Sequence, residues 1–312
     1  MTRIKARALR RGDTVAVVAP ASNIQRDMLT RGCDALRTMG YNPVFQESIV
    51  DRDLYFAGNV ERRVRELQEM FARDDVKAIV CARGGYGTNY LLGALDVKSV
   101  AAHPKIFVGY SDVTTLLTHF LDACGLVTFH GPMVTKDFAN ADGVDLASWE
   151  AALGAASEWV VETGVGSGAK GLRDGAGEGI LYGGCLSMLV ASLGTPYEIR
   201  TEGTILFLED IAAKPFQVDR MLMQMKLAGK FAGVRGIVFG EMIDCVQAAN
   251  QDYTLEEVVM RVVGDLGVPV AYGLRSGHVT RGNVTLPLGV KSSLAVQGTK
   301  VELKILEAAV ES

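Results

Sequence analysis

The stretch that decides the fold is residues 105–120, KIFVGYSDVTTLLTHF, where a short apolar run passes directly into a helical pattern. Ile106, Phe107 and Val108 predict a buried strand. The apolar residues that follow recur at steps of three and four: Val113, Leu116, Leu117 and Phe120. This spacing predicts a helix with one apolar face, so Ser111 is expected at a strand-to-helix turn.

A serine at such a turn can act as a nucleophile. The backbone N–H groups of a first helical turn have no partner within the helix, and the helix dipole favours negative charge near them. Gly109 would allow a strained approach to the turn. The α/β-hydrolase elbow, G-x-S-x-G, works in this way, but Val113 occupies its fifth position here, so that family is not matched. Ser111 or Asp112 could instead only cap the helix, and both interpretations stay open.

Strand and helix patterns alternate through the first half of the chain. Strands are expected at 14–19, 43–45, 78–82 and 106–108, and helices at 28–39, 60–72 and after Ser111. This order predicts a parallel sheet with helices on both faces, whose functional edge lies at the carboxyl ends of the strands. The loops expected at that edge are 20–23, 83–88 and 110–112.

The second of these loops is rich in glycine. It lies in ARGGYGTNYLL, residues 82–92, between an apolar strand and a helical pattern. Gly84, Gly85 and Gly87 would let backbone N–H groups approach a phosphate, a carboxylate or an oxyanion. The loop matches neither a Walker A loop nor G-x-G-x-x-G. A tight turn that needs positive φ is the alternative interpretation.

Composition limits the class of protein. The chain has 312 residues, 48% hydrophobic and 22% charged, which is typical of a globular protein large enough for two domains. The net charge of −4 argues against a nucleic-acid partner, because phosphate neutralisation needs a basic surface. Basic residues near the start are not followed by an apolar run of signal-peptide length, so we expect neither a signal peptide nor a membrane span, and a cytoplasmic location.

Cysteine and histidine give little sign of metal or thiol chemistry. The five cysteines are widely spaced and form no C-x-x-C pair: Cys33, Cys81, Cys124, Cys185 and Cys245. This pattern is typical of reduced, mostly buried thiols, although a catalytic thiol is conceivable. The four histidines show no metal-ligand spacing, so we expect no metal site.

The character of the chain changes between residues 139 and 179. The stretch VETGVGSGAKGLRDGAGEG, residues 161–179, is typical of a linker or mobile loop. We therefore expect an amino-terminal domain over 1–165, a Gly-rich linker over 166–178 and a carboxy-terminal domain over 179–312. Trp149 and Trp159 precede the Gly-rich stretch and are expected to pack rather than to stack on a ligand.

The second domain supplies an acid and a histidine, each after a predicted strand. Residues 204–208 form an apolar run that ends in Glu209, and residues 268–274 lead to a loop that contains His278. A carboxylate after a strand usually caps or solvates a turn, and a lone histidine is usually structural. Together with Ser111, however, they would supply the base and the orienting carboxylate that a hydroxyl nucleophile needs.

A set of motifs along nearly the whole chain resembles the LD-carboxypeptidase family of serine peptidases, which also includes microcin C self-immunity hydrolases. The motifs, in chain order, are AVVAPAS (16–22), ARGGYG (82–87), GYSD (109–112), HGPM (130–133), GGCLSMLVASLGTPY (183–197), FLED (207–210) with VDRML downstream, and GHV (277–279). Cys185 stands where we expect Asn in many relatives, within a packing motif.

The resemblance implies a fold and a set of residue roles. The implied fold is α/β, with a parallel-sheet flavodoxin- or Rossmann-like amino-terminal domain, a smaller α/β carboxy-terminal domain, a site in the cleft and often a homodimer. Ser111 is implied as the nucleophile, Glu209 as the orienter and His278 as the general base. The two backbone amides of the implied oxyanion hole map onto Gly85 and Asp112.

Three functions follow as hypotheses. The first is removal of a terminal D-Ala from a murein tetrapeptide through an acyl-enzyme, with no cofactor, in which Arg83 would bind the substrate carboxylate. Arg83 could instead form a structural ion pair. The second is an immunity-type hydrolase that cleaves peptidyl or aminoacyl nucleotides, which would need an aromatic ring from residues 133–179 to stack on a base. The third is a binding module without catalysis.

Overall fold

The chain divides into two compact units. A computed structural model describes residues 2–161, 168–246 and 252–312. Unit 1 comprises Met1–Ser157, Thr280–Gly289 and Ala308–Ser312, and unit 2 comprises Glu158–Val279 and Val290–Glu307. The chain therefore leaves unit 2 after Val279, one residue past His278, contributes ten residues to unit 1 and returns. These units are a division by packing, and the expected domain limits of 1–165 and 179–312 remain predictions.

Unit 1 is built on a six-stranded sheet. Its strands, in the order in which they lie in the sheet, are β12 (Leu286–Leu288), β5 (Thr128–His130), β4 (Ile106–Gly109), β3 (Val76–Cys81), β1 (Thr14–Val18) and β2 (Asn42–Val44). The pairs β1–β2, β1–β3, β3–β4 and β4–β5 are parallel, and β12 pairs antiparallel with β5. The order 2-1-3-4-5 is that of a flavodoxin-like sheet, in which ligands bind where the order reverses, at β1 and β3.

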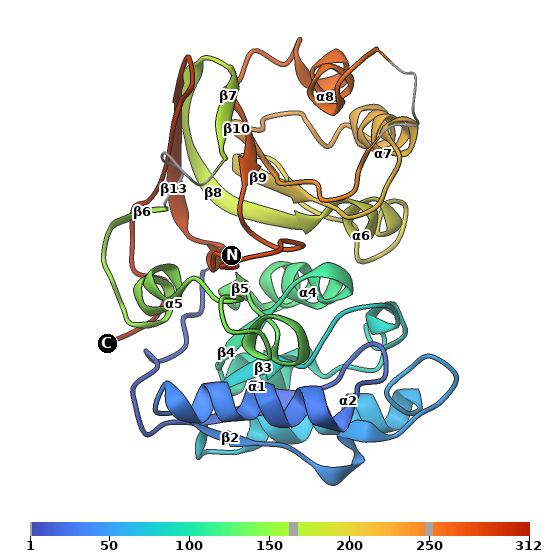
Figure 1. Cartoon of the computed structure of the whole chain (residues 1–312), viewed down its shortest axis with the longest axis vertical. Helices are drawn as coiled ribbons and strands as arrows, with labels where there is room; N and C mark the ends of the chain where they lie inside the picture. Colours follow the sequence, from blue (N-terminus) through green and yellow to red (C-terminus); the bar gives the residue numbers. More distant parts are fainter. Residues whose placement is uncertain (1, 162–167, 247–251) are drawn as a thin grey trace. The chain divides into compact units, whose positions relative to one another are not determined.

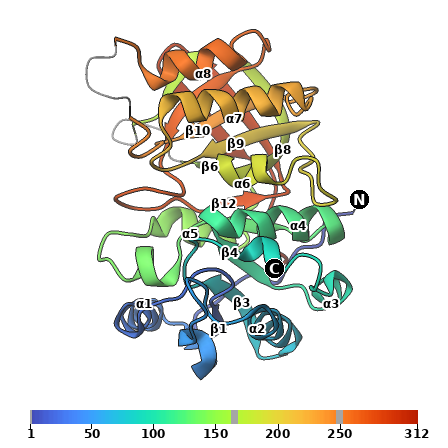
Figure 2. The same cartoon turned by 90° about the vertical axis from the view of Figure 1, so that its right-hand side faces the viewer.

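Helices cover both faces of this sheet, as expected. The helices of unit 1 are α1 (Arg26–Thr38), α2 (Val60–Ala72), α3 (Val97–Ala102), α4 (Thr114–Cys124) and α5 (Leu146–Leu153). Figure 2 views α1 and α2 nearly end on, with β1 and β3 drawn between them. A cluster of buried rings holds α2 and α4 against β4, because Phe107 lies 5.9 Å from Phe71 and 5.1 Å from Phe120 between ring centroids.

Unit 2 contains a mixed eight-stranded sheet. Its strands, in sheet order, are β6 (Trp159–Val161), β14 (Lys300–Ile305), β13 (Lys291–Gln297), β8 (Gly175–Cys185), β9 (Thr204–Glu209), β10 (Gly236–Gly240), β11 (Val270–Leu274) and β7 (Lys170–Arg173). The central strands β8, β9, β10 and β11 are parallel, and the outer pairs are antiparallel. The carboxyl ends of β9 and β11 therefore lie at the same edge of the sheet.

Three helices pack together on one face of the second sheet (Figure 1). They are α6 (Leu186–Ala191), α7 (Pro215–Leu227) and α8 (Leu255–Val263). The two-domain α/β fold that the family resemblance implies is thus confirmed, as is the parallel arrangement that the alternating pattern predicts for the strands of the first half of the chain. No helix in the described part of the chain is both long enough and apolar enough to cross a membrane.

The Gly-rich stretch that the sequence analysis expects to be a linker contains strands in the structure. Residues 166 and 167 lie outside the described residues, but most of 168–178 belongs to β7 and to the start of β8, so the expected linker is wrong there. Glycine is required for close packing of backbone: a Cβ on Gly177 would lie 2.0 Å from the carbonyl oxygen of Arg235. A Cβ on Gly171 would lie 2.2 Å from the carbonyl oxygen of Gly298.

Candidate active site

Ser111 stands at the turn between β4 and α4, as the sequence predicts. It begins a short helical turn, Ser111–Val113, and its φ of 61° is positive, which is uncommon for a residue with a side chain. Backbone strain of this kind costs on the order of 1–3 kcal/mol and tends to occur at functional sites. Gly109 is needed below it, because a Cβ there would lie 2.7 Å from Cγ1 of Val113. The turn therefore has the strained geometry of a nucleophile elbow.

The Gly-rich loop lies directly against this turn. A Cβ on Gly84 would be 2.7 Å from Cβ of Ser111 and 3.2 Å from the backbone nitrogen of Asp112. Gly85 has a φ of 102°, and a Cβ on it would be 2.3 Å from Oγ of Ser22. The structure thus brings together the two segments that carry the expected oxyanion donors, Gly85 and Asp112, with Ser111 beside them.

The loop after β1 supports the Gly-rich loop from the other side. The backbone N–H of Ser22 donates to the carbonyl oxygen of Gly84 at 3.3 Å, and the N–H of Tyr86 donates to Oγ of Ser22 at 3.1 Å. Sequence analysis placed this loop at the functional edge but gave Ser22 no role. Its position after β1, where the strand order reverses, was the available signal.

The Asp112 side chain binds the Gly-rich loop instead of capping α4. Its Oδ2 accepts from the backbone N–H of Thr88 at 2.9 Å, and the backbone N–H of Gly87 also donates to the carboxylate. In return, Oγ1 of Thr88 donates to the carbonyl oxygen of Asp112 at 2.7 Å. Burial raises the pKa of Asp112 despite these hydrogen bonds. These reciprocal bonds fix the Gly-rich loop to the turn that carries Ser111.

Unit 2 contains a preformed acid–base pair. Nδ1 of His278 lies 2.7 Å from Oε2 of Glu209, and the backbone N–H of His278 donates to the same oxygen at 3.0 Å. The Glu209 side chain is 1% exposed and that of His278 is 11% exposed. Because an Nδ1–H that donates to a carboxylate leaves the lone pair on Nε2, this histidine is oriented to act as a base through Nε2.

Two glycines make room for the Glu209 side chain. Gly277 has a φ of 93°, and a Cβ on it would lie 2.5 Å from the carboxyl carbon of Glu209. A Cβ on Gly240, at the end of β10, would lie 2.6 Å from Cβ of Glu209. Gly240 was not identified from the sequence, because nothing in a linear pattern shows which residue of the neighbouring strand packs against a carboxylate.

The neighbouring acid and thiol have different surroundings. Asp210 accepts from the backbone N–H groups of Ser187 and Ile211, both at 2.8 Å, so it anchors the start of α6 rather than the histidine. Cys185 is buried, and burial raises the pKa of its thiol well above the usual range. A thiol held protonated in this way is a poor nucleophile, which argues against the alternative of a catalytic cysteine at this position.

Arg83 and the two tryptophans complete the sequence-predicted residues. Arg83 is exposed, and its Nη1 donates to the carbonyl oxygen of Asn23 at 3.3 Å, so its role toward a substrate remains a prediction. Trp149 is fully buried and donates through Nε1 to the Tyr41 hydroxyl at 3.3 Å. It packs, as expected, and Trp159 is half-buried on β6.

A strained serine beside backbone amides, together with a histidine oriented by a carboxylate, is the equipment of a serine hydrolase. Family models agree with this class: the model of the LD-carboxypeptidase N-terminal domain matches residues 15–131, and that of the C-terminal domain matches residues 178–294. The chain belongs to the LD-carboxypeptidase family, whose members are serine-type hydrolases.

Individual relatives support the assignment over the full length. The chain is 37% identical to the probable murein peptide carboxypeptidase of Bacillus subtilis (strain 168), covering 98% of this chain and 95% of that protein. It is 30% identical to the murein tetrapeptide carboxypeptidase of Pseudomonas aeruginosa, covering 85% and 87%. A solved structure of MccF in complex with glutamyl sulfamoyl guanosine matches with a TM-score of 0.90 at 25% identity, covering 98% and 99%.

Proposed function

We propose that the chain removes a terminal D-Ala from murein tetrapeptides by acyl transfer through Ser111, His278 and Glu209. The observation that carries the chemistry is the Glu209–His278 pair at 2.7 Å, together with the strained Ser111 at its own sheet edge. The substrate comes from relatives named as murein peptide and murein tetrapeptide carboxypeptidases.

The proposed reaction has two steps. Nε2 of His278 takes the proton of the Ser111 hydroxyl as Oγ attacks the amide carbonyl before the terminal D-Ala. The backbone amides of Gly85 and Asp112 hold the resulting oxyanion, each worth about 3–4 kcal/mol in comparable sites. His278 then protonates the departing amine, the C–N bond breaks and D-Ala leaves. A water molecule, deprotonated by His278, cleaves the acyl ester and restores the serine.

Glu209 acts on the histidine in this proposal. Its carboxylate accepts the Nδ1–H of His278, which holds the ring in the tautomer with a basic Nε2 and stabilises the imidazolium that forms. Arg83 is proposed to bind the free carboxylate of the substrate, because its guanidinium is exposed in the same loop as Gly85. From the family resemblance, we also propose that the protein is cytoplasmic and forms a homodimer.

Ser111→Ala tests the nucleophile, and Glu209→Gln tests the orienter. Each protein is incubated with a murein tetrapeptide, and D-Ala release is followed by mass spectrometry. We expect Ser111→Ala to abolish detectable release and Glu209→Gln to lower kcat about 10,000-fold, since the amide cannot hold the required tautomer. Release by Ser111→Ala at the wild-type rate would exclude Ser111 as the nucleophile.

The second candidate is an immunity-type hydrolase that cleaves aminoacyl nucleotides. The observation that favours it is the match to MccF, whose solved structure holds glutamyl sulfamoyl guanosine. Trp149 is buried against Phe138 and Tyr41, so it does not offer an exposed ring for a nucleobase. Absence of D-Ala release with hydrolysis of an aminoacyl sulfamoyl adenylate by the wild type would favour this candidate over the first.

A further inference from the structure

Arg63 links two of the three loops at the carboxyl edge of the unit 1 sheet. It lies in the first turn of α2 with a fully buried side chain. Its Nη1 donates to the carbonyl oxygen of Pro20 at 2.9 Å and to that of Gly87 at 2.8 Å. Burial lowers the pKa of Arg63, and the charge of Asp112 opposes that shift. Burying an arginine costs free energy unless its N–H groups find hydrogen-bond acceptors. The side chain of Arg63 is therefore expected to stay where it bonds these two carbonyl oxygens.

Arg63 and Asp112 hold the same short backbone segment from opposite sides. Arg63 takes the carbonyl oxygen of Gly87, while the Asp112 carboxylate takes the N–H groups of Gly87 and Thr88. Gly87 has a φ of 128°, and a Cβ on it would lie 2.7 Å from Nη1 of Arg63. The backbone therefore rests directly on the guanidinium, with room for glycine alone.

This segment begins two residues after Gly85. Charge-assisted hydrogen bonds to backbone groups are stronger than neutral ones, and burial strengthens them further. Gly85 has no side chain that could fix the direction of its backbone N–H. That direction therefore depends on the contacts that hold the flanking residues. Ser22 holds the two neighbours of Gly85, Gly84 and Tyr86, and Arg63 with Asp112 holds the next residues, Gly87 and Thr88.

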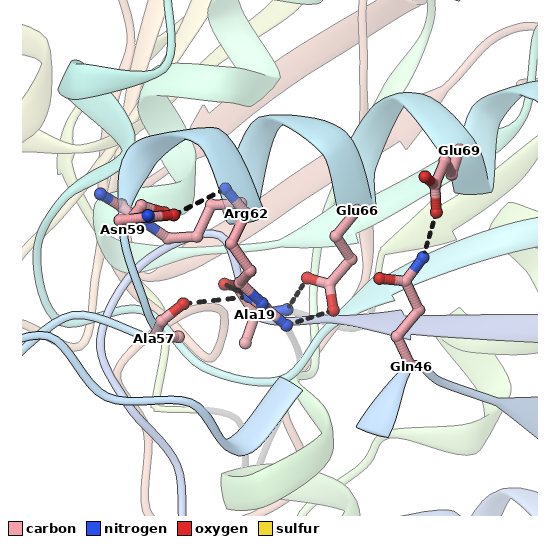
Figure 3. A network of polar contacts seen from close by, with 8 residues as sticks. Ala19, Gln46, Ala57, Asn59, Arg62, Glu66 and Glu69 are labelled. Carbon is pink, nitrogen blue, oxygen red and sulfur yellow. Dashed lines mark hydrogen bonds and ion pairs between the residues drawn. The ribbon is translucent and has the colours of Figure 1, made fainter. Parts of the chain in front are cut away.

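The preceding residue in the chain provides a matched comparison. Arg62 is also buried, at 4% exposed, and burial also lowers its pKa. Figure 3 shows that its guanidinium pairs with Glu66 and donates to the carbonyl oxygens of Ala19, at 3.1 Å, and Ala57, at 3.0 Å. Oε2 of Glu66 accepts from the N–H of Ala19 at 2.8 Å. These contacts anchor α2 to the end of β1 and not to the Gly-rich loop.

We propose that Arg63 is a positioning residue for the oxyanion hole. Arg63 bonds the carbonyl oxygen of Gly87 while the Asp112 carboxylate accepts from the backbone N–H of Thr88, and together these contacts keep the Gly85 amide directed toward the oxyanion that forms at Ser111. The inference rests on the proposed function, in which Gly85 and Asp112 donate to the oxyanion. It assigns to Arg63 an effect on the transition state that Arg62 lacks, although both are buried arginines on one helix.

The test compares Arg63→Lys with Arg62→Lys. Lysine keeps the charge, but its side chain is shorter and ends in an ammonium, so it does not bring a donor to the place of Nη1 between the Pro20 and Gly87 carbonyl oxygens. Three quantities are measured: the thermal midpoint Tm, kcat and KM for the murein tetrapeptide, and the rate constant for labelling of Ser111 by a fluorophosphonate. The phosphonate reacts with the activated Ser111 hydroxyl and uses the oxyanion hole, but it makes no use of the contacts that bind the peptide, so its rate does not depend on how the peptide binds.

We expect Arg63→Lys to lower kcat and the labelling rate together, each about 10- to 100-fold, with KM changed by less than about twofold. Both variants should lower Tm, and to a similar extent, because each removes contacts of a buried arginine. Arg62→Lys, however, should leave kcat and the labelling rate within about threefold of wild type. Equal rate losses in the two variants, or no rate loss in Arg63→Lys, would overturn the inference.

Thr88→Val covers the case in which Arg63→Lys does not fold. It keeps Arg63 and removes the bond from Oγ1 of Thr88 to the Asp112 carbonyl, so we expect the labelling rate to fall about 3- to 10-fold. An unchanged labelling rate would count against the inference that the contacts holding Gly87 and Thr88 position the Gly85 amide. A wild-type protein that neither releases D-Ala nor reacts with the phosphonate would overturn the proposed function itself, and this inference with it.

Discussion

Two Gly-rich stretches of this chain have similar composition and opposite structure. Residues 82–88, ARGGYGT, form a loop that side chains from other segments hold in place, namely Ser22, Arg63 and Asp112. Residues 170–185 form the strands β7 and β8, which backbone pairing holds in the second sheet. In both stretches, glycine occupies positions where the backbone lies very close to other atoms. The two stretches share this close packing, and they do not share flexibility.

The two stretches differ in what lies against the glycine. Gly84 faces the Ser111 side chain, whereas Gly177 faces the carbonyl oxygen of Arg235. A methyl group added to the first would displace Ser111, the proposed nucleophile, and one added to the second would separate two segments of a sheet. The comparison therefore predicts loss of activity at one stretch and loss of stability at the other.

Among the changes that test this comparison, Gly84→Ala has the largest expected effect, and that effect is on activity. Its Cβ would lie 2.7 Å from Cβ and 3.0 Å from Oγ of Ser111, so the serine must move relative to the proposed oxyanion donors. We expect kcat to fall about 100- to 1,000-fold, the range seen when one oxyanion donor is lost, with only a small change in Tm. Steady-state kinetics and thermal unfolding measure the two effects.

The control for this change is Gly12→Ala, which adds the same methyl group at a φ of 92° with no atom within 4 Å. It should leave kcat within about twofold and cost about 1 kcal/mol of stability through backbone strain. A Gly84→Ala protein with wild-type kcat would show that the loop and the serine can separate without consequence.

Next in size is the effect of Gly177→Ala on stability. A Cβ only 2.0 Å from the Arg235 carbonyl oxygen forces the strand away from its neighbour, and we expect a loss of about 2–4 kcal/mol in the free energy of unfolding. Because Gly177 lies near the opposite end of β8 from Cys185, which pairs with Glu209, kcat of the folded protein should stay near wild type.

Urea unfolding monitored by circular dichroism measures this loss, and Glu178→Ala, at the next and exposed position of β8, is the matched control. A Gly177→Ala protein as stable as Glu178→Ala would mean that the second stretch tolerates side chains and is not a close-packed strand.

The smallest expected effect is on how the free energy of unfolding depends on pH, and it comes from Asp112, the carboxylate that holds the first stretch. Burial raises the pKa of Asp112 from its ordinary 3.8, so the folded protein binds this proton more tightly than the unfolded chain does. The free energy of unfolding should therefore fall as pH rises from about 3.8 through the folded-state pKa. Asp112→Asn removes this component, so its stability should decline less over the same range.

Urea unfolding at several pH values measures the difference between wild type and Asp112→Asn. Asp27→Asn, at an exposed site in the first turn of α1, controls for the loss of one negative charge. If wild type and Asp112→Asn lost stability in parallel as pH rose, the raised pKa of Asp112 would not be a feature of the folded protein.

Much of the fold was predictable because local pattern and tertiary structure agree there. The helix expected at 60–72 is α2, with the same bounds, and the strand expected at 106–108 is β4 less one residue. The Ser111 turn followed from the change in hydrophobic period. The stretch 168–178 was misassigned because glycine in a sequence does not reveal whether a loop or a neighbouring strand lies against it.

By itself, the sequence determined the alternation of strands and helices, the placement of Ser111, Glu209 and His278 at strand ends, and the family to which the chain belongs. These depend on residue order and periodicity, which are local properties. Only the tertiary structure decided that His278 bonds Glu209 rather than Asp210, and that Arg63 rather than Arg62 reaches the Gly-rich loop. Adjacent residues of similar chemistry differ there only in the direction in which the backbone points their side chains, and packing of distant segments sets which contacts they make.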